Sequence, residues 1–287
     1  MRVLKKIFKK IQRQFFGNTI KIGDFTLNIG RGHNLPYVLD KYPEYGDNLI
    51  RLARCVESKE GVSSIIDIGA NVGDTTAMLL TDNPKREVIA IEGDTYFFDI
   101  LNKNLKGDKR VHTVKVFLGE QDTEVQAATQ RNNGTLRIKE SNENTKVELI
   151  TLDSLLKKNP HFKNARILKI DTDGYDNKIL RGAKEYLLNQ GPVLFFEYDT
   201  ELLKSNNENS LDIFAFLKNC GYKTVLFYDN HGRFILSLDC TDTQQITQLN
   251  RYITGKKGGF AFYDLIVFHH NDVELAKSFI ASEDKVL

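Results

Sequence analysis

A glycine-containing loop carries the strongest chemical signal in the chain. Residues 67–75 read D-I-G-A-N-V-G-D-T and stand between a β-branched run and a helical stretch. Gly69 and Gly73 let the backbone pass close to a ligand, and the amides of the following helix N-terminus can donate hydrogen bonds to it. Glu92 ends the next predicted strand, 19 residues after Gly73, where an acid can accept both hydroxyls of a ribose. These features predict a ligand that contains a nucleoside.

The spacing within this loop separates two kinds of nucleoside ligand. Dinucleotide sites use G-x-G-x-x-G, whereas this loop reads G-x-x-x-G. Asp67 would repel a pyrophosphate, but it suits the ammonium group of S-adenosylmethionine. An NAD-dependent sugar dehydrogenase or epimerase and a non-catalytic cofactor-binding partner protein are the alternatives. The missing G-x-G, and the lack of a Tyr-x-x-x-Lys pair in a predicted helix downstream of the loop, weigh against the dehydrogenase.

A second group of acids, Asp171, Asp173 and Asp176, follows a predicted buried strand. Ligands of open α/β sheets bind at this carboxyl edge. One carboxylate could accept a hydroxyl proton, several could hold a divalent metal, or they could cap a helix. The glycine and glutamate of an EF-hand loop are absent at the required positions. We predict that Asp171 and Asp173 are catalytic and that no metal is bound.

Two further residues are candidates for contact with a substrate. His33 is the one histidine in a motif-like stretch, G-H-N-L-P at residues 32–36, and is the third predicted catalytic residue. Glu197 ends the fifth predicted strand at the same edge of the sheet, where it either contacts substrate or is solvated. The three cysteines are too scattered for a zinc site or a disulfide framework.

The elements that must position these residues alternate between strands and helices. Their apolar strands indicate a parallel sheet that helices cover on both faces, in a doubly wound α/β domain. The predicted strands are residues 64–68, 88–92, 114–118, 166–171, 193–197, 223–228 and 263–269. The predicted helices are residues 75–80, 97–105, 153–158, 177–188 and 211–219. We expect Asp153 to cap its own helix, residues 132–145 to form a surface loop with at most a short hairpin, and residues 239–259 to be an irregular connection.

The same motifs resemble the FkbM-type S-adenosylmethionine-dependent methyltransferases. The resemblance runs through D-I-G-A-N-V-G-D-T at 67–75, I-E at 91–92, T-L-D-S-L at 151–155 and L-K-I-D-T-D-G-Y-D at 168–176. It continues to Y-D at 263–264 and covers roughly residues 60–270. Two positions depart from the family pattern, with E-G for E-P at 92–93 and D-x-D-G-x-D for D-x-E-G-x-E at 171–176.

This resemblance implies a Rossmann-like class I methyltransferase sheet of seven strands, the last one antiparallel, with S-adenosylmethionine as cofactor. The implied acceptor is a sugar hydroxyl of a glycan, polysaccharide or natural-product precursor. The loop around Gly119 and Glu120 would flank the adenine. The predicted cofactor-binding residues are Asp67, Gly69, Ala70, Asn71, Gly73, Asp74, Glu92, Gly119 and Glu120.

The ends of the chain differ in composition from its body. Residues 1–17 contain six basic residues and no acid on an amphipathic pattern, which leaves the rest at −4 because the whole chain sums to +2. Such a helix either covers a patch of its own domain or contacts an acidic partner or an anionic membrane surface. The negative remainder argues against a nucleic-acid partner. We expect a lead-in at 18–60, the methyltransferase domain at 61–270 and a tail helix at 271–287.

Composition and sequence pattern also indicate the cellular location of the protein. Of its 287 residues 41% are hydrophobic and 27% charged, as in ordinary soluble globular proteins. We find no apolar run of the ~20 residues that span a bilayer, and no secretory signal. We therefore expect a cytoplasmic protein that contacts the inner membrane surface at most peripherally.

Overall fold

The computed structural model describes residues 19–132, 135–140, 146–256 and 260–286. The basic amphipathic helix expected at residues 1–17 lies outside these ranges. In the part of the chain that is described, every helix is too short or too polar to cross a bilayer.

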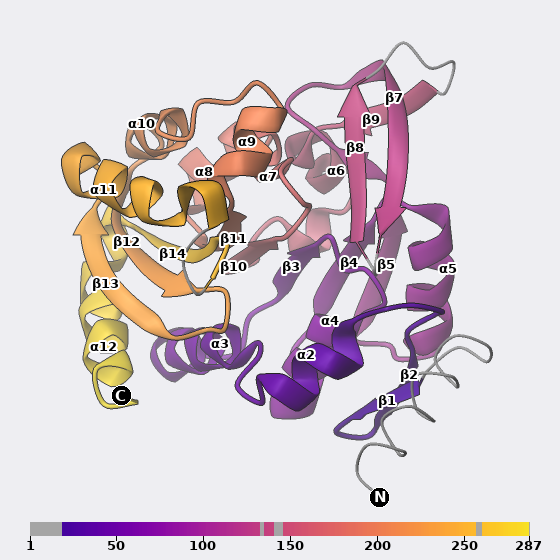
Figure 1. The fold of residues 1–287 in the computed structure, drawn as a ribbon. Coiled ribbons are helices and arrows are strands. Elements are labelled where there is room, and N and C mark those ends of the chain that lie inside the picture. The colour runs from indigo at the N-terminus through magenta and orange to yellow at the C-terminus, as the bar shows by residue number, and fades with distance from the viewer. Residues whose placement is uncertain (1–18, 133–134, 141–145, 257–259, 287) are drawn as a thin grey trace, which may run out of the picture.

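An eight-stranded sheet forms the centre of the molecule (Figure 1). Its order is β13-β12-β14-β11-β10-β3-β4-β5, and β14 runs antiparallel to both of its neighbours. The strands are β3 (Ile65–Ile68), β4 (Val88–Glu92), β5 (Val111–Lys115), β10 (Ile167–Ile170), β11 (Val193–Tyr198), β12 (Tyr222–Asp229), β13 (Phe234–Asp239) and β14 (Tyr263–His269). The predicted class I order with an antiparallel last strand is confirmed, and β13 adds an eighth strand at one edge.

Helices cover both faces of this sheet because its central strands are apolar on both sides. Residues of β3 and β10 that alternate along the chain enter two different cores. Helices α6, α7, α8, α10 and α11 pack on one face, and α3, α4 and α12 pack on the other. The helices are α2 (Leu35–Lys41), α3 (Asp47–Glu60), α4 (Asp74–Asp82), α5 (Thr95–Asn104), α6 (Leu152–Lys158), α7 (Asp176–Arg181), α8 (Lys184–Gln190), α9 (Thr200–Ser205), α10 (Asp212–Asn219), α11 (Thr243–Ile253) and α12 (Val273–Glu283), with short 3-10 turns at Pro160–Phe162, Thr254–Lys256 and His270–Asp272.

A second sheet replaces the loop that was predicted between the third and fourth strands. Its order is β6-β9-β7-β8, with β6 (Phe117–Leu118), β7 (Thr123–Asn132), β8 (Thr135–Glu140) and β9 (Lys146–Ile150). The prediction of a surface loop over residues 132–145 was therefore wrong in extent. In β9, Val147 and Leu149 are buried while Lys146 and Glu148 are exposed, which is the alternation of a half-buried strand.

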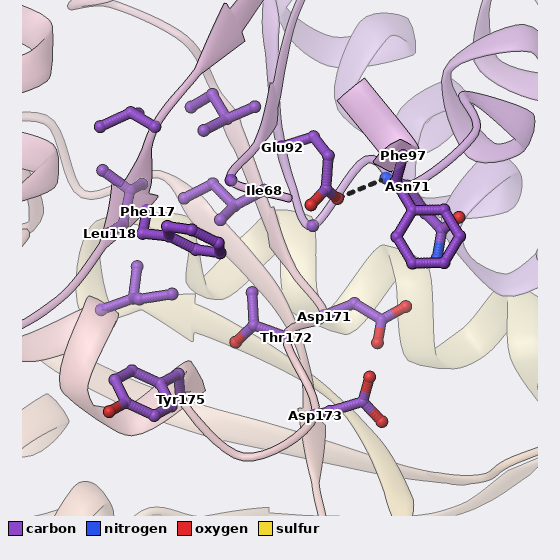
Figure 2. A pocket seen from close by; sticks show the side chains of 15 residues that line it. Ile68, Asn71, Glu92, Phe97, Phe117, Leu118, Asp171, Thr172, Asp173 and Tyr175 are labelled. Carbon is purple, nitrogen blue, oxygen red and sulfur yellow. Dashed lines mark hydrogen bonds between the residues drawn. The ribbon is translucent and has the colours of Figure 1, made fainter. Parts of the chain in front are cut away.

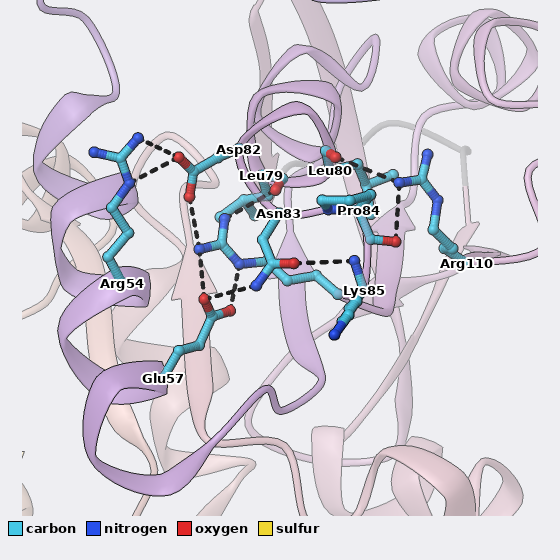
Figure 3. Close-up of polar contacts among 10 residues, drawn as sticks. Arg54, Glu57, Leu79, Leu80, Asp82, Asn83, Pro84, Lys85 and Arg110 are labelled. Atoms are coloured by element: carbon cyan, nitrogen blue, oxygen red, sulfur yellow. Dashed lines mark hydrogen bonds and ion pairs between the residues drawn. The ribbon is translucent and has the colours of Figure 1, made fainter.

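The lead-in at residues 18–60 shares the core of the domain that follows it. Strands β1 (Thr19–Ile22) and β2 (Phe25–Asn28) pair with each other, and α3 buries Leu52 and Val56 against the large sheet. Arg86 is fully buried and its guanidinium binds Glu57 of α3 and Asp82 of α4. Figure 3 labels these two carboxylates. The expected boundary near residue 60 therefore does not separate two cores.

Two local predictions were wrong for reasons of packing. Asp153 does not cap α6, because Thr151 accepts the amide of Ser154 there and Asp153 accepts the amides of Glu185 and Tyr186 at the start of α8. The irregular connection predicted at 239–259 contains a helix, α11, which buries Ile246, Asn250 and Ile253 at helical spacing.

Candidate active site

Two adjoining cavities lie at the carboxyl edge of the large sheet. The inner cavity has a volume of about 70 Å³ and lies among the ends of β3, β4 and β10, β6 and the start of α7. The outer cavity has a volume of about 400 Å³ and lies between lead-in residues 33–49 and the ends of β10, β11 and β14. Gly69, Asn71, Asp171 and Asp173 line both. The predicted loop and the predicted catalytic acids therefore form the wall between the two cavities.

The glycine loop fits between β4 and β10 because Gly69 has no side chain at the point of closest approach. The amides of Gly69 and Ala70 both donate to the carbonyl of Ile91 at 3.0 Å. Gly69 has a φ of +72°, and a Cβ at this position would lie 1.9 Å from the carbonyl oxygen of Asp171. Only glycine satisfies both conditions. The side chain of Ala70, in contrast, packs in the core, so any contribution of Ala70 to a ligand site is through its backbone.

Glu92 lies at the rim of the inner cavity, where Figure 2 shows its carboxylate turned toward Asn71. One oxygen accepts the amide of Asn71 at 2.9 Å and the other accepts the amide of Asp94 at 2.8 Å. Burial raises the pKa of Glu92 to about 7. A carboxylate oxygen can accept a second hydrogen bond, so each could also take one hydroxyl of a diol. This geometry fits the predicted role of Glu92 toward a ribose.

The opposite side of the inner cavity is apolar. Phe117 and Leu118 line it together with Ile68 (Figure 2), and this surface suits the flat face of a nucleobase. Glycine at position 93 is required here, because a Cβ would lie 2.0 Å from the Phe117 ring. Glycine in place of the family's proline at position 93 therefore leaves the space that the Phe117 ring occupies.

Gly119 and Glu120, which were predicted to flank the base, line neither cavity. The amide of Gly119 donates to Ile150, and Glu120 forms an ion pair with Arg181 at 2.8 Å. The chain turns away from the cavity after Leu118 because β6 pairs with β9. Residues 116–118, just before them in the sequence, line the inner cavity instead.

Asp67 is placed beneath the loop and not in either cavity. Its side chain is fully buried, accepts a hydrogen bond from the Thr76 hydroxyl at 2.7 Å and pairs with Lys169 Nζ at 3.0 Å. This partner was missed in the sequence, although a lysine within a buried strand requires a carboxylate nearby. The prediction that Asp67 meets the cofactor's ammonium directly does not agree with this geometry, since Lys169 already neutralises it.

The two predicted catalytic acids lie side by side, and Figure 2 shows both carboxylates on the side of the cavity away from Phe117. The side chain of Asp171 is 45% exposed, and its Oδ2 lies 3.6 Å from Lys169 Nζ. Asp173 has a left-handed φ of +51°, which turns the chain sharply after β10. Asp176 is instead buried and accepts hydrogen bonds from the Thr172 hydroxyl and the Gly174 amide, so it fixes this turn.

His33 lines the outer cavity and contacts the glycine loop. Its Nδ1 accepts the amide of Leu35 at 3.1 Å, and its Nε2 lies 3.3 Å from Asn71 Oδ1. Because Nδ1 is an acceptor, the Nε2 proton of the neutral ring donates to Asn71. Burial lowers the pKa of His33, which keeps the ring neutral. Both ring nitrogens are therefore engaged, an arrangement that orients Asn71 and does not favour proton abstraction.

The rest of the outer cavity contains several acids, of which Asp74 is buried and Glu197 and Asp264 are half-buried. Burial raises the pKa of Asp74 to about 6 and that of Asp264 to about 7, and it raises the pKa of Glu197 well above its usual range. Glu197 and Asp264 lie opposite each other on β11 and β14. Tyr45, from the lead-in, closes another wall. Asp264 was indicated only within the Y-D motif of the family resemblance, without a role, and no sequence signal indicated Tyr45.

Among the described residues no group of three or more histidines, cysteines, aspartates or glutamates is disposed to hold a metal ion. The inner cavity nevertheless matches the predicted organic cofactor in its chemistry. It has an acid for a diol, an apolar wall for a base, and a glycine loop that a single Cβ would obstruct.

Comparisons with known proteins agree with this chemistry. The sequence profile described as the methyltransferase FkbM domain matches residues 67–224, more than half of the chain. A search of curated protein sequences found no significant match.

Among solved structures, the chain is similar to a methyltransferase FkbM from Methylobacillus flagellatus KT. The identity is 18% and the TM-score 0.40, over 57% of this chain and 40% of that one. The chain thus spans less than half the length of this relative. It is also similar to a precorrin-6Y C5,15-methyltransferase from Geobacter metallireducens GS-15, with 13% identity, 77% and 87% coverage and a TM-score of 0.41. A Methanococcus jannaschii fibrillarin pre-rRNA processing protein shows 12% identity, 89% and 84% coverage and a TM-score of 0.40.

The family match begins at Asp67, the first residue of the glycine loop, and continues past β11 into β12. It therefore contains every strand end that lines the inner cavity, and it excludes the dehydrogenase alternative. The chain belongs to the FkbM family of S-adenosylmethionine-dependent methyltransferases.

Proposed function

We propose that this methyltransferase methylates a hydroxyl group of a sugar, within a glycan, a polysaccharide or a natural-product precursor. The observation that carries the proposal is the position of Asp171. Its carboxylate lies in the wall between an inner cavity suited to a nucleoside and an outer cavity with room for a sugar ring. A base at this junction can face an acceptor hydroxyl and the methyl donor at the same time.

The residues of the inner cavity would hold S-adenosylmethionine. Glu92 would accept the ribose hydroxyls, Phe117 and Leu118 would pack against the adenine, and the loop at Gly69 would lie against the methionyl part. When bound, the cofactor supplies a methyl group on a sulfonium sulfur, which becomes a neutral thioether once the acceptor oxygen has taken the methyl. The chain's own task is to align the hydroxyl and to remove its proton.

Asp171 is the residue that we assign to proton removal. Its side chain is more exposed than those of Asp67 and Asp176, which are buried, and it lines both cavities. As the oxygen–methyl bond forms, the hydroxyl proton passes to this carboxylate. Asn71, held by His33, lies on the same wall and can accept or donate a hydrogen bond to fix the acceptor.

The outer cavity provides the groups that recognise sugars. Carboxylates and amides bind hydroxyl groups by accepting and donating hydrogen bonds, and aromatic rings pack on the apolar faces of sugar rings. Glu197, Asp264 and Asn48 provide the polar groups, and Tyr45 and Phe262 provide aromatic surface. This mixture supports a polyhydroxylated acceptor over an apolar one. A cytoplasmic location and membrane contact through residues 1–17 stay predictions.

The test uses a panel of glycosides that differ in ring configuration, incubated with purified protein and methyl-labelled S-adenosylmethionine. We expect label on at least one glycoside, and a loss of at least ~100-fold in kcat for Asp171→Asn, which is the usual contribution of a general base. The affinity for S-adenosylhomocysteine should change less than threefold in that variant.

Glu120→Gln is the matched control, because Glu120 is an acid of the same strand-end region that lines neither cavity. It should retain wild-type turnover. Label on no glycoside, with label transferred instead to a non-sugar hydroxyl, would replace the proposed substrate class. Full activity of Asp171→Asn would remove the assigned base.

A further inference from the structure

Lys169 is a buried cation at the junction of the two cavities, and the roles assigned so far do not include it. It lies in β10, is 3% exposed, and stands in register with Asp67 on the neighbouring strand. Its Nζ lies 3.0 Å from Asp67 Oδ1 and 3.6 Å from Asp171 Oδ2. It also lies 3.3 Å from the carbonyl oxygen of Gly69. One ammonium group therefore contacts the strand before the loop, the loop itself and the assigned base.

No other cation competes for this place. Of the described residues that line the two cavities, Lys169 is the one lysine or arginine. Burial alone would lower the pKa of Lys169, but the carboxylates of Asp67 and Asp171 raise it, so the group stays charged. A charge this deeply buried is retained only with partners in fixed positions.

Asp67 and Thr76 in turn fix the lysine. Asp67 accepts the Thr76 hydroxyl at 2.7 Å on one oxygen and binds Lys169 on the other. The chain of contacts runs from α4 through Asp67 to Lys169 and ends at Asp171, which is the one member with a largely exposed side chain. An exposed aspartate can otherwise rotate among several positions.

We propose that Lys169 is a positioning residue of the active site, whose ammonium holds the Asp171 carboxylate at the junction of the two cavities. Asp67 then acts on the reaction through Lys169, and not by binding the cofactor. The expected effect on turnover rests on the proposed function, in which Asp171 is the base. The expected effect on the placement of Asp171 is independent of that function.

The experiment compares Asp67→Asn with the double variant Asp67→Asn/Lys169→Met. Lys169→Met alone would leave Asp67 charged and buried without its cation, and such a variant can fail to fold. The double variant removes both charges, and Met fills most of the volume of the lysine stem. Asp67→Asn is the reference variant, because it loses the same carboxylate as the double variant but keeps the ammonium of Lys169. The asparagine oxygen can still accept a hydrogen bond from Lys169, and Asp171 remains as its charged partner.

The first readout is a crystal structure of each variant with S-adenosylhomocysteine, supported by the calorimetric affinity for that ligand. We expect Asp171 to keep one conformation facing residue 169 in Asp67→Asn, and to turn away or occupy several conformations in the double variant. The affinity for S-adenosylhomocysteine should stay within threefold between the two. An unchanged Asp171 conformation in the double variant would overturn the inference, whatever the substrate is.

The second readout is turnover of the glycoside that the wild-type protein methylates best. We expect kcat of the double variant to fall at least tenfold below that of Asp67→Asn, with KM little changed, as for a group that acts only in the transition state. Parallel losses of affinity, melting temperature and kcat would show a role limited to stability. If wild-type protein methylates no glycoside, the proposed function fails while the crystallographic comparison still decides the role of Lys169.

Discussion

Buried carboxyl groups dominate the site at the scale of single residues. Glu92, Asp74 and Asp264 lie in or beside the cavities, and burial raises the pKa of each toward neutrality. Desolvation disfavours the charged form of an acid, so these groups take up protons in the range in which the protein works. Ligand binding that needs a charged acid must therefore depend on pH.

Cofactor affinity should increase as the pH rises through 7. The pKa of Glu92 is about 7 because of burial, partly offset by the amides of Asp94 and Asn71 and by Lys169. Ribose hydroxyls donate to the ionised form, so binding is weaker where Glu92 is protonated. We expect the calorimetric dissociation constant of S-adenosylhomocysteine to fall about three- to tenfold between pH 6 and pH 8. Glu92→Gln should bind weakly and lose most of this dependence, and an unchanged pH dependence in that variant would assign it to another group.

The space beside Gly69 should be as important as its backbone conformation. Gly69→Ala places a Cβ 1.9 Å from the Asp171 carbonyl oxygen, whereas at Gly107, with a φ of +85°, a Cβ meets nothing within 4 Å. Both variants have the left-handed strain of about 1–2 kcal/mol, but only the first also has the overlap. We expect Gly69→Ala to weaken S-adenosylhomocysteine binding at least tenfold and to lower the melting temperature more than Gly107→Ala. Equal effects of the two would show that conformation alone decides.

At this scale, local spacing was enough to place some residues at a cavity. Gly69 and Glu92 line the inner cavity, as expected from the glycine loop and the strand end, whereas Gly73 lies against Leu101 and Leu105 and lines neither cavity. Asp67 was misplaced because its partner, Lys169, is 102 positions away in the sequence. Such long-range pairing cannot be read from a local motif.

At the scale of elements, ion pairs connect the lead-in to the sheet. Arg86 Nε lies 2.5 Å from Glu57 of α3, its Nη2 lies 2.8 Å from Asp82 of α4, and its Nη1 donates to the Leu79 carbonyl (Figure 3). The arginine is fully buried between the two helices. The helix α3 then extends toward lead-in residues 42–46, which line the outer cavity. This network therefore supports one wall of the site from a distance.

Loss of Arg86 should destabilise the whole domain. Arg86→Met leaves Glu57 without its cation and Asp82 with only the exposed Arg54, and breaking a buried pair costs about 3–5 kcal/mol. Arg54→Met removes another partner of Asp82, but the Arg54 side chain is 66% exposed, so that change should cost at most ~1 kcal/mol. Denaturant unfolding of both variants measures the difference. Similar free energies of unfolding would show that the buried network contributes no more than a surface pair.

Elements were predictable where their periodicity was strong. The central strands are continuous apolar runs and were placed within about two residues, whereas β7, β8 and α11 are mostly polar and were missed. In α11, Ile246 and Ile253 are the buried apolar residues, and Asn250 donates to the Tyr198 hydroxyl. A helix held by so few apolar contacts has little signal in its composition, and its tertiary partners decide its structure.

At the scale of the whole molecule, the fold explains why the acids gather in one place. The order of the sheet brings the ends of β3, β4, β10 and β11 to one edge, and the antiparallel β14 begins there with Asp264. The doubly wound topology was predictable because strands and helices alternate along the chain. The depth of burial at that edge was not, because it depends on the lead-in packing over it.

The cofactor-free protein should become more stable as the pH is lowered from 8 to 6.5. Between these values Glu92, Asp264 and Glu197 bind more protons in the folded state, where their pKa values are raised, than in the unfolded chain. The unfolding free energy falls with rising pH wherever the native state binds more protons. His33 and His269 act in the opposite direction, but their pKa values are lowered from 6.5, so they matter mainly at more acidic pH.

We expect the melting temperature to be at least about 2 °C higher at pH 6.5 than at pH 8, since a protein of this size gains about 2–4 °C for each kcal/mol. Asp264→Asn should reduce this slope and raise the stability at pH 8, because the asparagine oxygen can still accept from Asn48 while no buried charge forms. Glu120→Gln should leave the slope unchanged. A melting temperature that rises with pH over this interval would mean that water reaches these carboxylates and keeps them ionised. The acids of the outer cavity would then behave as ordinary surface charges. Solvent would screen their electrostatic interactions with an acceptor.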